Sequence, residues 1–208
     1  MIALLLLAEP AGASLVLYNT RTDWLSAVSG VTVIDFAAQS QGTTGFTFYN
    51  TAEGLTVSGV NFVGYAGTPG AYNLKVTNPA YQPTFNRGTG PILAGGWSPN
   101  YLVATLPGAG VYALALDYSS ETQGRNITIV LSTGETYNLT SSSNSTLKFF
   151  GFTTDVPVTS ISFSASNTNT MIDNFSYADP VAEPESILLG VTGLLGIWLA
   201  RRMRPRAG

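Results

Sequence analysis

Residues 160–165 read Ser-Ile-Ser-Phe-Ser-Ala, and this strict alternation decides the fold class. Successive side chains of an extended strand point to opposite faces, so the apolar residues share one face and the serines share the other. One apolar face and one polar face are typical of an antiparallel sheet that covers a core. Ile127, Ile129 and Leu131 repeat the pattern, with Thr128 on the opposite side. Both segments therefore predict antiparallel sheet.

Similar strand-like runs, separated by Gly, Pro, Asn and Ser, fill the middle of the chain. The predicted strands are 15–18, 31–36, 55–63, 74–77, 101–106, 111–117, 126–131, 135–140, 147–152, 158–165 and 171–177. Residues 131–135 predict a hairpin turn. A brief helix is predicted over 23–28, capped by Asn19 or Thr20 and stopped by Gly30. The expected fold is all-β, a two-sheet antiparallel β-sandwich similar to a jelly roll.

The composition excludes several kinds of chemistry. The 208 residues include no His and no Cys, so zinc sites of the common kind, Ser-His-Asp triads and Cys nucleophiles are excluded. Charged residues make up only 10% of the chain, and the net charge is −3. No basic patch is present in the middle of the chain to neutralise phosphates, which argues against nucleic acid as a partner. We predict no catalytic residues.

The first residues resemble an export signal. Residues 2–8 are apolar, and residues 11–13 offer small side chains for cleavage, which predicts a secretory signal over 1–13. The usual basic residues at the start are missing, as they would be in a truncated signal. The alternative is a buried first strand, which the Glu-Pro pair at positions 9 and 10 would interrupt. The working domain is therefore expected over 14–180.

The last residues predict contact with a membrane. Residues 187–200 carry no charge and, as a single hydrophobic helix, would span about 21 Å, which is short against a hydrocarbon core of about 30 Å. A core helix would normally have a polar face, which this segment lacks. The basic cluster of Arg201, Arg202, Arg204 and Arg206 predicts a cytoplasmic C-terminus. A transient inner-membrane anchor is the expected role.

Three features of residues 181–208 occur in the order of a known sorting signal. The motif Ala182-Glu183-Pro184, the apolar segment and the arginine cluster together resemble the PEP-CTERM tail, although Ala182 replaces the first proline of the motif. The resemblance implies that an exosortase of Gram-negative bacteria recognises and cuts the tail. It also implies export through the secretion machinery, followed by release or attachment at the cell surface, in the envelope or exopolysaccharide matrix of a biofilm.

A second resemblance concerns the domain itself. Residues 149–177, FFGFTTDVPVTSISFSASNTNTMIDNFSY, are similar to the closing half of β-sandwich domains carried by PEP-CTERM proteins. These sandwiches are similar in layout to carbohydrate-binding modules, and acids near the first and last strands of such modules hold a structural Ca²⁺. The resemblance makes Asp35 and Asp173 candidate ligands for a structural Ca²⁺, and no other cofactor is predicted. The alternative for each acid is a solvated side chain, or one that caps a turn of its own backbone.

Aromatic residues gather in the Gly-, Pro- and Asn-rich stretch 64–100. Trp97 lies in a predicted loop, and Tyr65, Tyr72, Tyr81 and Phe85 lie near it in sequence. Exposed rings on loops stack on sugars, so Trp97 is the candidate ligand contact for polysaccharide. The alternative is that these rings close one end of the sandwich.

Carboxylate pairs would be needed for a polysaccharide hydrolase. The candidates are Asp35, Glu53, Asp117, Glu121, Glu135, Asp155 and Asp173. Glu121 and Glu135 lie in turn-like surroundings, which favours simple solvation. The leading hypothesis is a non-catalytic exported surface or matrix protein sorted through its tail. The alternative is a carbohydrate-binding module, with or without Ca²⁺, and a hydrolase ranks below both.

Overall fold

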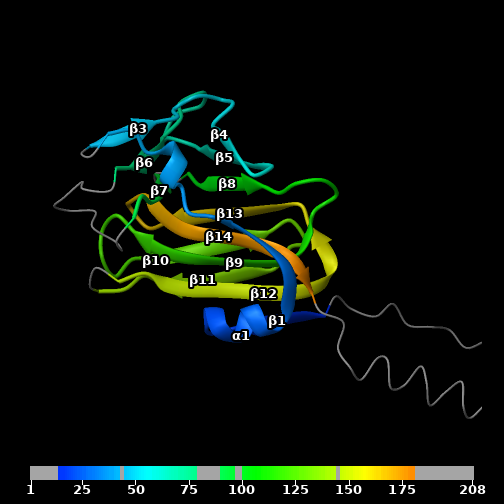
Figure 1. The fold of residues 1–208 in the computed structure, drawn as a ribbon. Coiled ribbons are helices and arrows are strands. Elements are labelled where there is room, and N and C mark those ends of the chain that lie inside the picture. The colour runs from blue at the N-terminus through cyan, green and yellow to red at the C-terminus, as the bar shows by residue number, and fades with distance from the viewer. Residues whose placement is uncertain (1–13, 43–44, 79–89, 97–99, 144–145, 181–208) are drawn as a thin grey trace, which may run out of the picture.

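The computed structural model describes residues 14–42, 45–78, 90–96, 100–143 and 146–180. These residues form two stacked antiparallel sheets (Figure 1), which confirms the prediction of an all-β sandwich. The finer assignment to a jelly roll stays a prediction. The predicted signal segment and the predicted C-terminal helix lie outside the described residues. Within the described residues, no helix is long and apolar enough to cross a membrane.

Sheet A contains eight of the described strands. Its strands follow the order β1 (Leu15–Tyr18), β12 (Lys148–Val158), β9 (Val111–Ser120), β14 (Thr170–Pro180), β7 (Leu93–Gly95), β6 (Leu74–Thr77) and β3 (Phe46–Phe48). The remaining strand, β2 (Val28–Ile34), pairs with the second half of β14, beyond the short β7.

Sheet B contains six described strands and faces sheet A. Its order is β11 (Thr136–Thr140), β10 (Asn126–Leu131), β13 (Ser160–Ala165), β8 (Leu102–Thr105), β5 (Val60–Gly64) and β4 (Leu55–Val57). The alternation read from the sequence places Ile161 and Phe163 in the core between the sheets, as predicted. The serines of β13 therefore lie on the outer face of sheet B.

A short helix covers the outer face of sheet A. Helix α1 (Arg21–Ser26) begins after Thr20, whose side chain accepts a hydrogen bond from the Asp23 N–H, so the predicted Thr20 cap is confirmed. Trp24 is fully buried, and its Nε1 donates to the Phe152 carbonyl over 3.1 Å. The predicted end of the helix near Gly30 is wrong, because β2 already begins at Val28.

The structure also differs from the prediction in other elements. Residues 55–63 form two strands, because Ser58 and Gly59 both have positive φ (48° and 79°) and make a two-residue turn between paired strands. Strands β3 and β7 were not predicted, since three residues are too few to show a period. The short helix η1 (Ala37–Gln39) was not predicted either.

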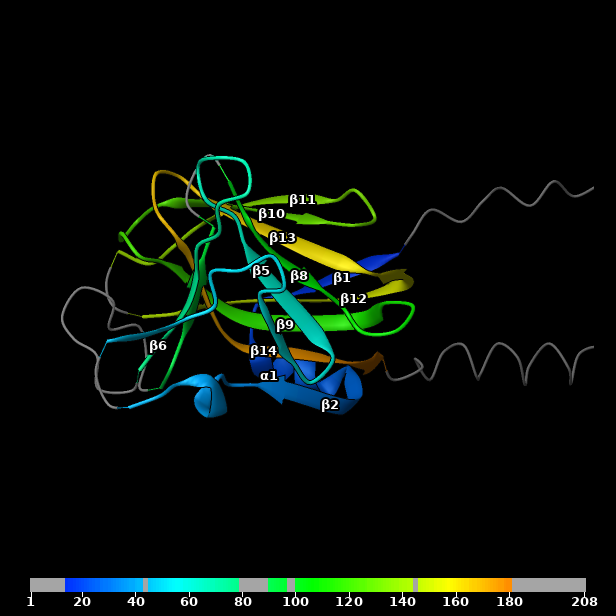
Figure 2. The same ribbon diagram turned by 90° about the horizontal axis from the view of Figure 1, so that it is seen from above.

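The described chain begins and ends at the same end of the sandwich (Figures 1 and 2). Leu15, the first residue of β1, pairs with Thr154 in the second half of β12. Pro180, the last residue of β14, pairs with Val28. The connection between β13 and β14 lies at the opposite end of both sheets. We call these the terminus end and the loop end.

Candidate functional site: a tyrosine cluster on the outer face of sheet B

Tyr65 and Tyr101 extend two neighbouring strands of sheet B toward the loop end. Gly64 of β5 pairs with Leu102 of β8, which is a core residue, and the Tyr65 N–H donates to the Tyr101 carbonyl over 3.1 Å. Because side chains alternate along a strand, both tyrosines lie on the face away from the core. Tyr72 forms a bridge pair with Tyr65 on its other side. Three tyrosines thus lie side by side on one outer face.

The central ring, Tyr65, contacts the other two rings. The ring centroids of Tyr65 and Tyr101 are 5.2 Å apart with an interplanar angle of 51°, and those of Tyr65 and Tyr72 are 5.8 Å apart at 44°. These distances lie in the range of favourable aromatic pairs. Tyr101 is 45% exposed, and the other two tyrosines are half-buried. The cluster therefore presents aromatic surface and phenol groups to solvent.

Glycines allow the Tyr72 segment to approach the sheet. A Cβ on Gly64 would lie 2.0 Å from the Asn73 carbonyl oxygen, and a Cβ on Gly95 would lie 2.7 Å from the same atom. Any larger residue at either position would force the backbone apart. The close approach permits the Asn73 N–H to donate to the Gly64 carbonyl over 2.8 Å. This contact holds Tyr72 beside Tyr65.

A buried polar network fixes the chain that follows Tyr72. The Asn73 Nδ2 donates to Asn169 Oδ1 over 2.7 Å, and Asn169 donates in turn to Glu121. Glu121 forms an ion pair with Lys75 over 2.9 Å, and the two side chains are only 10% and 13% exposed. The Lys75 ammonium also lies 4.7 Å from the centroid of the Phe46 ring. The expectation that Glu121 is simply solvated is therefore wrong, because Lys75 and Asn169 compensate its burial.

Asp35 and Asp173, the candidate calcium ligands, each accept a hydrogen bond from nearby backbone. The Asp35 carboxylate accepts from the Ala37 N–H over 3.1 Å, which is a turn cap, and Asp173 accepts from the Asn174 N–H over 2.7 Å. No group of three or more His, Cys, Asp or Glu side chains that could hold a metal ion occurs in the described ranges. These residues give a calcium site no support, and calcium stays a prediction.

Asp173 instead belongs to a β-bulge on the outer face of sheet A. It pairs with Asp117 of β9, but the next pair joins Ser176 to Ala115, so β14 carries one extra residue. Asn174 takes up the irregularity with φ of 47°, and its side-chain amide donates to Asp117 over 2.8 Å. The bulge turns the backbone so that the Asn174 carbonyl can accept a hydrogen bond from helix α1.

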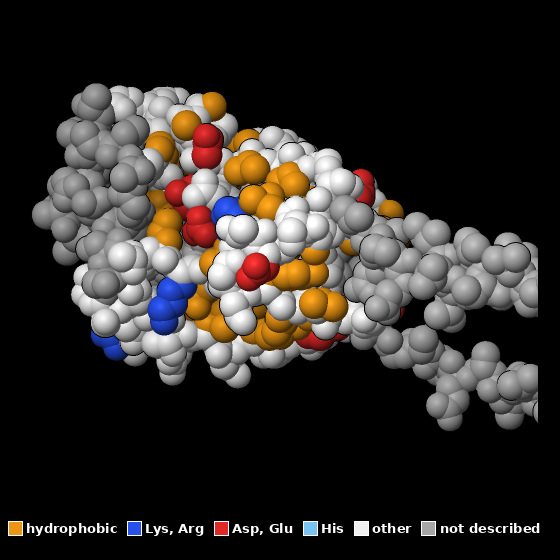
Figure 3. Space-filling view, turned by 60° about the horizontal axis from the view of Figure 1, so that its bottom comes forward, with side chains coloured by type: hydrophobic (Ala, Val, Ile, Leu, Met, Phe, Trp, Pro, Cys, Tyr) orange, Lys and Arg blue, Asp and Glu red, His pale blue; other side chains and the backbone are white. Residues whose placement is uncertain are grey.

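Arg21 of α1 supplies that bond and the positive charge of the cluster. Its guanidinium forms an ion pair with Asp117 (3.1 Å) and donates to the Ser176 hydroxyl (3.0 Å) and the Asn174 carbonyl (3.1 Å). Burial raises the pKa of the Asp173 carboxyl to about 6. The Asn174 N–H and Arg21 lower this pKa, whereas the charges of Asp117 and Asp35 raise it further. Figure 3 shows that charged side chains lie among apolar ones on this side of the molecule.

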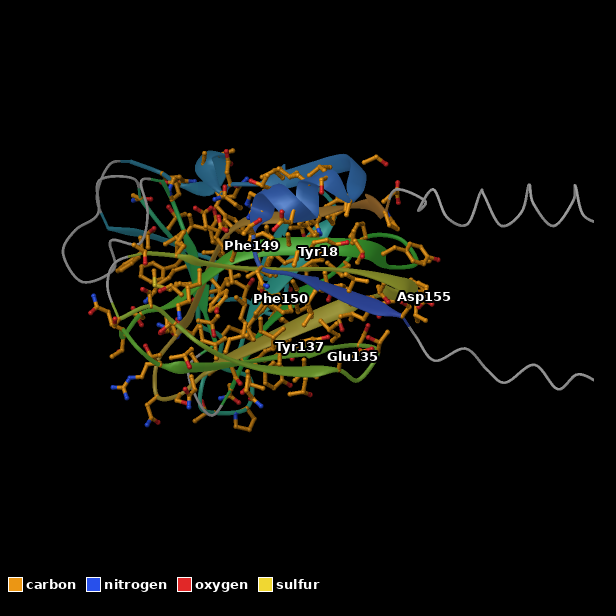
Figure 4. All side chains as sticks on the ribbon, turned by 90° about the horizontal axis from the view of Figure 1, so that it is seen from below. Tyr18, Glu135, Tyr137, Phe149, Phe150 and Asp155 are labelled. Carbon is orange, nitrogen blue, oxygen red and sulfur yellow. The ribbon has the colours of Figure 1, made fainter. Side chains whose placement is uncertain are left out.

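Two of the three remaining carboxylates proposed for glycoside hydrolysis have local structural partners, whereas Glu53 is exposed just before β4. Glu135 accepts a hydrogen bond from the Thr133 hydroxyl within the β10–β11 turn. Asp155 of β12 accepts from the Ser14 N–H over 2.8 Å and so holds the start of β1 in place. Figure 4 shows Glu135 beside Tyr137 and Asp155 farther along, near the terminus end. These contacts explain both residues structurally, and a hydrolase has no supporting observation.

Several predicted site residues lie outside the described residues. They are Trp97, Tyr81, Phe85, Ala182, Glu183, Pro184, Arg201, Arg202, Arg204 and Arg206. The sequence singled out the stretch that contains Tyr65 and Tyr72 but gave no role to Tyr101. One signal was available in the sequence. Tyr101 stands two residues before Val103 and four before Thr105, so it continues the outer face of β8 by one more residue.

The site and fold define a β-sandwich with a partly exposed aromatic cluster, and comparisons with known proteins add little. No family model matches the chain, and no curated protein matches it. Two solved structures that match part of the chain are a tyrosine-to-alanine and a lysine-to-alanine mutant of CBM29-2, studied for ligand recognition by family 29 carbohydrate-binding modules. The first is 14% identical, with 64% of this chain and 91% of that chain covered and a TM-score of 0.38. The second is 14% identical, with 67% and 99% covered and a TM-score of 0.39.

Proposed function

We propose that this domain binds carbohydrate through Tyr65, Tyr72 and Tyr101. The observation that carries the proposal is the gathering of these three rings on the outer face of sheet B, with Tyr101 45% exposed. The faces of aromatic rings pack against the C–H surfaces of sugars, and a tyrosine hydroxyl adds a hydrogen-bonding group at the edge. The cluster provides both features at one place, and we assign it a binding role without catalysis.

The alternative role for these rings is to close the loop end of the sandwich. Rings that served only this purpose would pack into the hydrophobic core. The core between the sheets includes Tyr118 but none of the three clustered tyrosines. Their surface position favours contact with a ligand.

The binding test uses calorimetric titration of the full chain with neutral polysaccharides such as mannan, xylan and β-glucan. Tyr101→Ala is the test variant, and Tyr112→Ala is the matched control, since Tyr112 is 40% exposed on β9 of the other sheet. Loss of one stacking ring should weaken binding by about 10-fold, which corresponds to roughly 1.4 kcal/mol. An equal effect of both variants, or no binding to any polymer, would refute the proposal.

We also propose, as the wider role, that the domain is exported and sorted by an exosortase through its PEP-CTERM-like tail. One observation favours this pairing of roles. The last described residue, Pro180, lies at the terminus end, whereas the tyrosine cluster lies toward the loop end. Attachment through the C-terminus would leave the cluster accessible. Mass spectrometry of the mature protein is expected to find the tail removed only when the exosortase is present; Arg201 retained in the surface form would contradict this.

A further inference from the structure

The outer face of sheet B carries no charged side chain among its described strands. By the alternation that sends their neighbours into the core, its strand residues are Thr56, Asn61, Val63, Val103, Thr105, Asn126, Thr128, Val130, Thr136, Asn138, Thr140, Ser160, Ser162 and Ser164. The face is therefore made of hydroxyl, amide and methyl groups. It differs from the outer face of sheet A, which carries α1 and the ionised cluster around Asp117.

Strand register aligns part of this face with the tyrosines. Thr128 pairs with Asn138 on one side and with Ser164 on the other. The pair between β13 and β8 nearest the loop end joins Phe163 to Leu102, so the next residues along, Ser164 and Tyr101, lie opposite each other. Tyr65 and Tyr72 continue the same line.

One row thus crosses the sheet at right angles to its strands, and we call it the polar–aromatic row. Its members are, in order, Asn138, Thr128, Ser164, Tyr101, Tyr65 and Tyr72. At about 4.8 Å between neighbouring strands, the row is roughly 24 Å long. That is several times the length of one sugar ring, so a single sugar would occupy only part of it.

The polar half of the row can bind hydroxyl groups. The Thr128 hydroxyl donates to Asn138 Oδ1 over 3.0 Å, which orients the amide so that its N–H groups remain available to a ligand. Hydroxyls and amides suit sugar hydroxyls, and the described strand residues of this face include no Lys or Arg to pair with a uronate carboxylate. The row therefore favours an uncharged ligand.

We propose that the ligand of the tyrosine cluster is an uncharged polysaccharide chain that lies along the polar–aromatic row, from Tyr72 to Asn138. This inference rests on the proposed carbohydrate binding and adds the ligand class, its direction across the sheet and its length. The site takes an internal stretch of a polymer, because all six residues of the row are at least partly exposed. Affinity rises with chain length until the row is filled.

The test compares neutral oligosaccharides of two to six units, cut from whichever polymer binds in the panel, by calorimetry on the full chain. Thr128→Arg places a long side chain on the row and leaves the tyrosines in place. Thr105→Arg is the matched control, since Thr105 is an exposed Thr on the same face but outside the row. Circular dichroism checks that both variants fold.

We expect Thr128→Arg to weaken binding of the six-unit ligand about 10-fold or more and to have little effect on binding of the two-unit ligand. Thr105→Arg should leave the affinity for both ligands unchanged. Tyr101→Ala should weaken the binding of both ligands. If Tyr101→Ala weakens binding but Thr128→Arg does not, the row is wrong and the tyrosine site stands. Equal affinity for short and long ligands, or tighter binding of polygalacturonate, also overturns the row. If neither variant matters, both proposals fail.

Discussion

Replacing Asp173 by Asn should stabilise the protein near neutral pH and reduce its pH dependence. Asp173 is only 8% exposed, and burial, helped by Asp117 and Asp35, raises its carboxyl pKa from 3.8 to about 6. Each pKa unit corresponds to about 1.4 kcal/mol, so ionising this carboxyl in the folded state costs roughly 3 kcal/mol. The asparagine keeps the shape and can still accept from the Asn174 N–H.

The direction in which stability changes with pH follows from proton binding to Asp173. Between pH 3.8 and about 6 the folded state holds the Asp173 proton more often than the unfolded state does, so its contribution to stability grows as the pH falls through this window. From about pH 7.5 to about pH 5 this single group should add roughly 1.4 kcal/mol to the free energy of unfolding. Arg21 remains paired with Asp117 in both proteins.

Urea unfolding of the native chain and of Asp173→Asn at these two pH values tests the reasoning. We expect the variant to be more stable by about 1 to 3 kcal/mol at the higher pH and to lose roughly 1.4 kcal/mol of this advantage at the lower pH. The difference between the two proteins isolates Asp173 from the other carboxyl groups. A variant that is less stable at both pH values would refute the account, because it would show that the Asp173 charge is favourable.

Two further predictions concern packing. Trp24→Ala should lower the free energy of unfolding by about 3 to 5 kcal/mol, because it empties a fully buried site and removes the Nε1 donor to the Phe152 carbonyl. Calorimetric melting checks this prediction, and an unchanged melting temperature would contradict it. Gly64→Ala should weaken glycan binding and stability together, because the new Cβ would meet the Asn73 carbonyl that holds Tyr72 in place. Gly67→Ala, which has no atom within 4 Å of the new Cβ, should change neither, and equal effects of the two would argue against the glycine contact.

The fold class could be predicted from the sequence because its signal is local. The alternation in β13 and β10, the Thr20 cap and the 131–135 turn each depend on a few neighbouring residues, and the structure agrees with all of them. The split at Ser58 was missed because only the following Gly59 signals a turn, and the apolar pattern continues on both sides of it.

The candidate site could not be predicted from the sequence in the same way. Tyr65, Tyr72 and Tyr101 meet because β5 pairs with β8 and because Gly64 admits the Asn73 carbonyl, and both are contacts between distant parts of the chain. The polar–aromatic row depends on the register of four strand pairings, which no single segment reveals. The role of Asp173 was equally hidden, since the bulge at Asn174 is defined against β9.

The most direct test of the carbohydrate-binding account is a titration of the ¹⁵N-labelled chain with a neutral six-unit oligosaccharide, followed residue by residue by NMR. The account predicts that amide shifts concentrate at Tyr65, Tyr72 and Tyr101 and extend across the sheet to Ser164 of β13 and Thr128 of β10. Amides of α1 and of the Asp173 bulge, on the opposite sheet, should not move. Shifts confined to the α1 side, or none at all with every neutral ligand, would contradict the central claim.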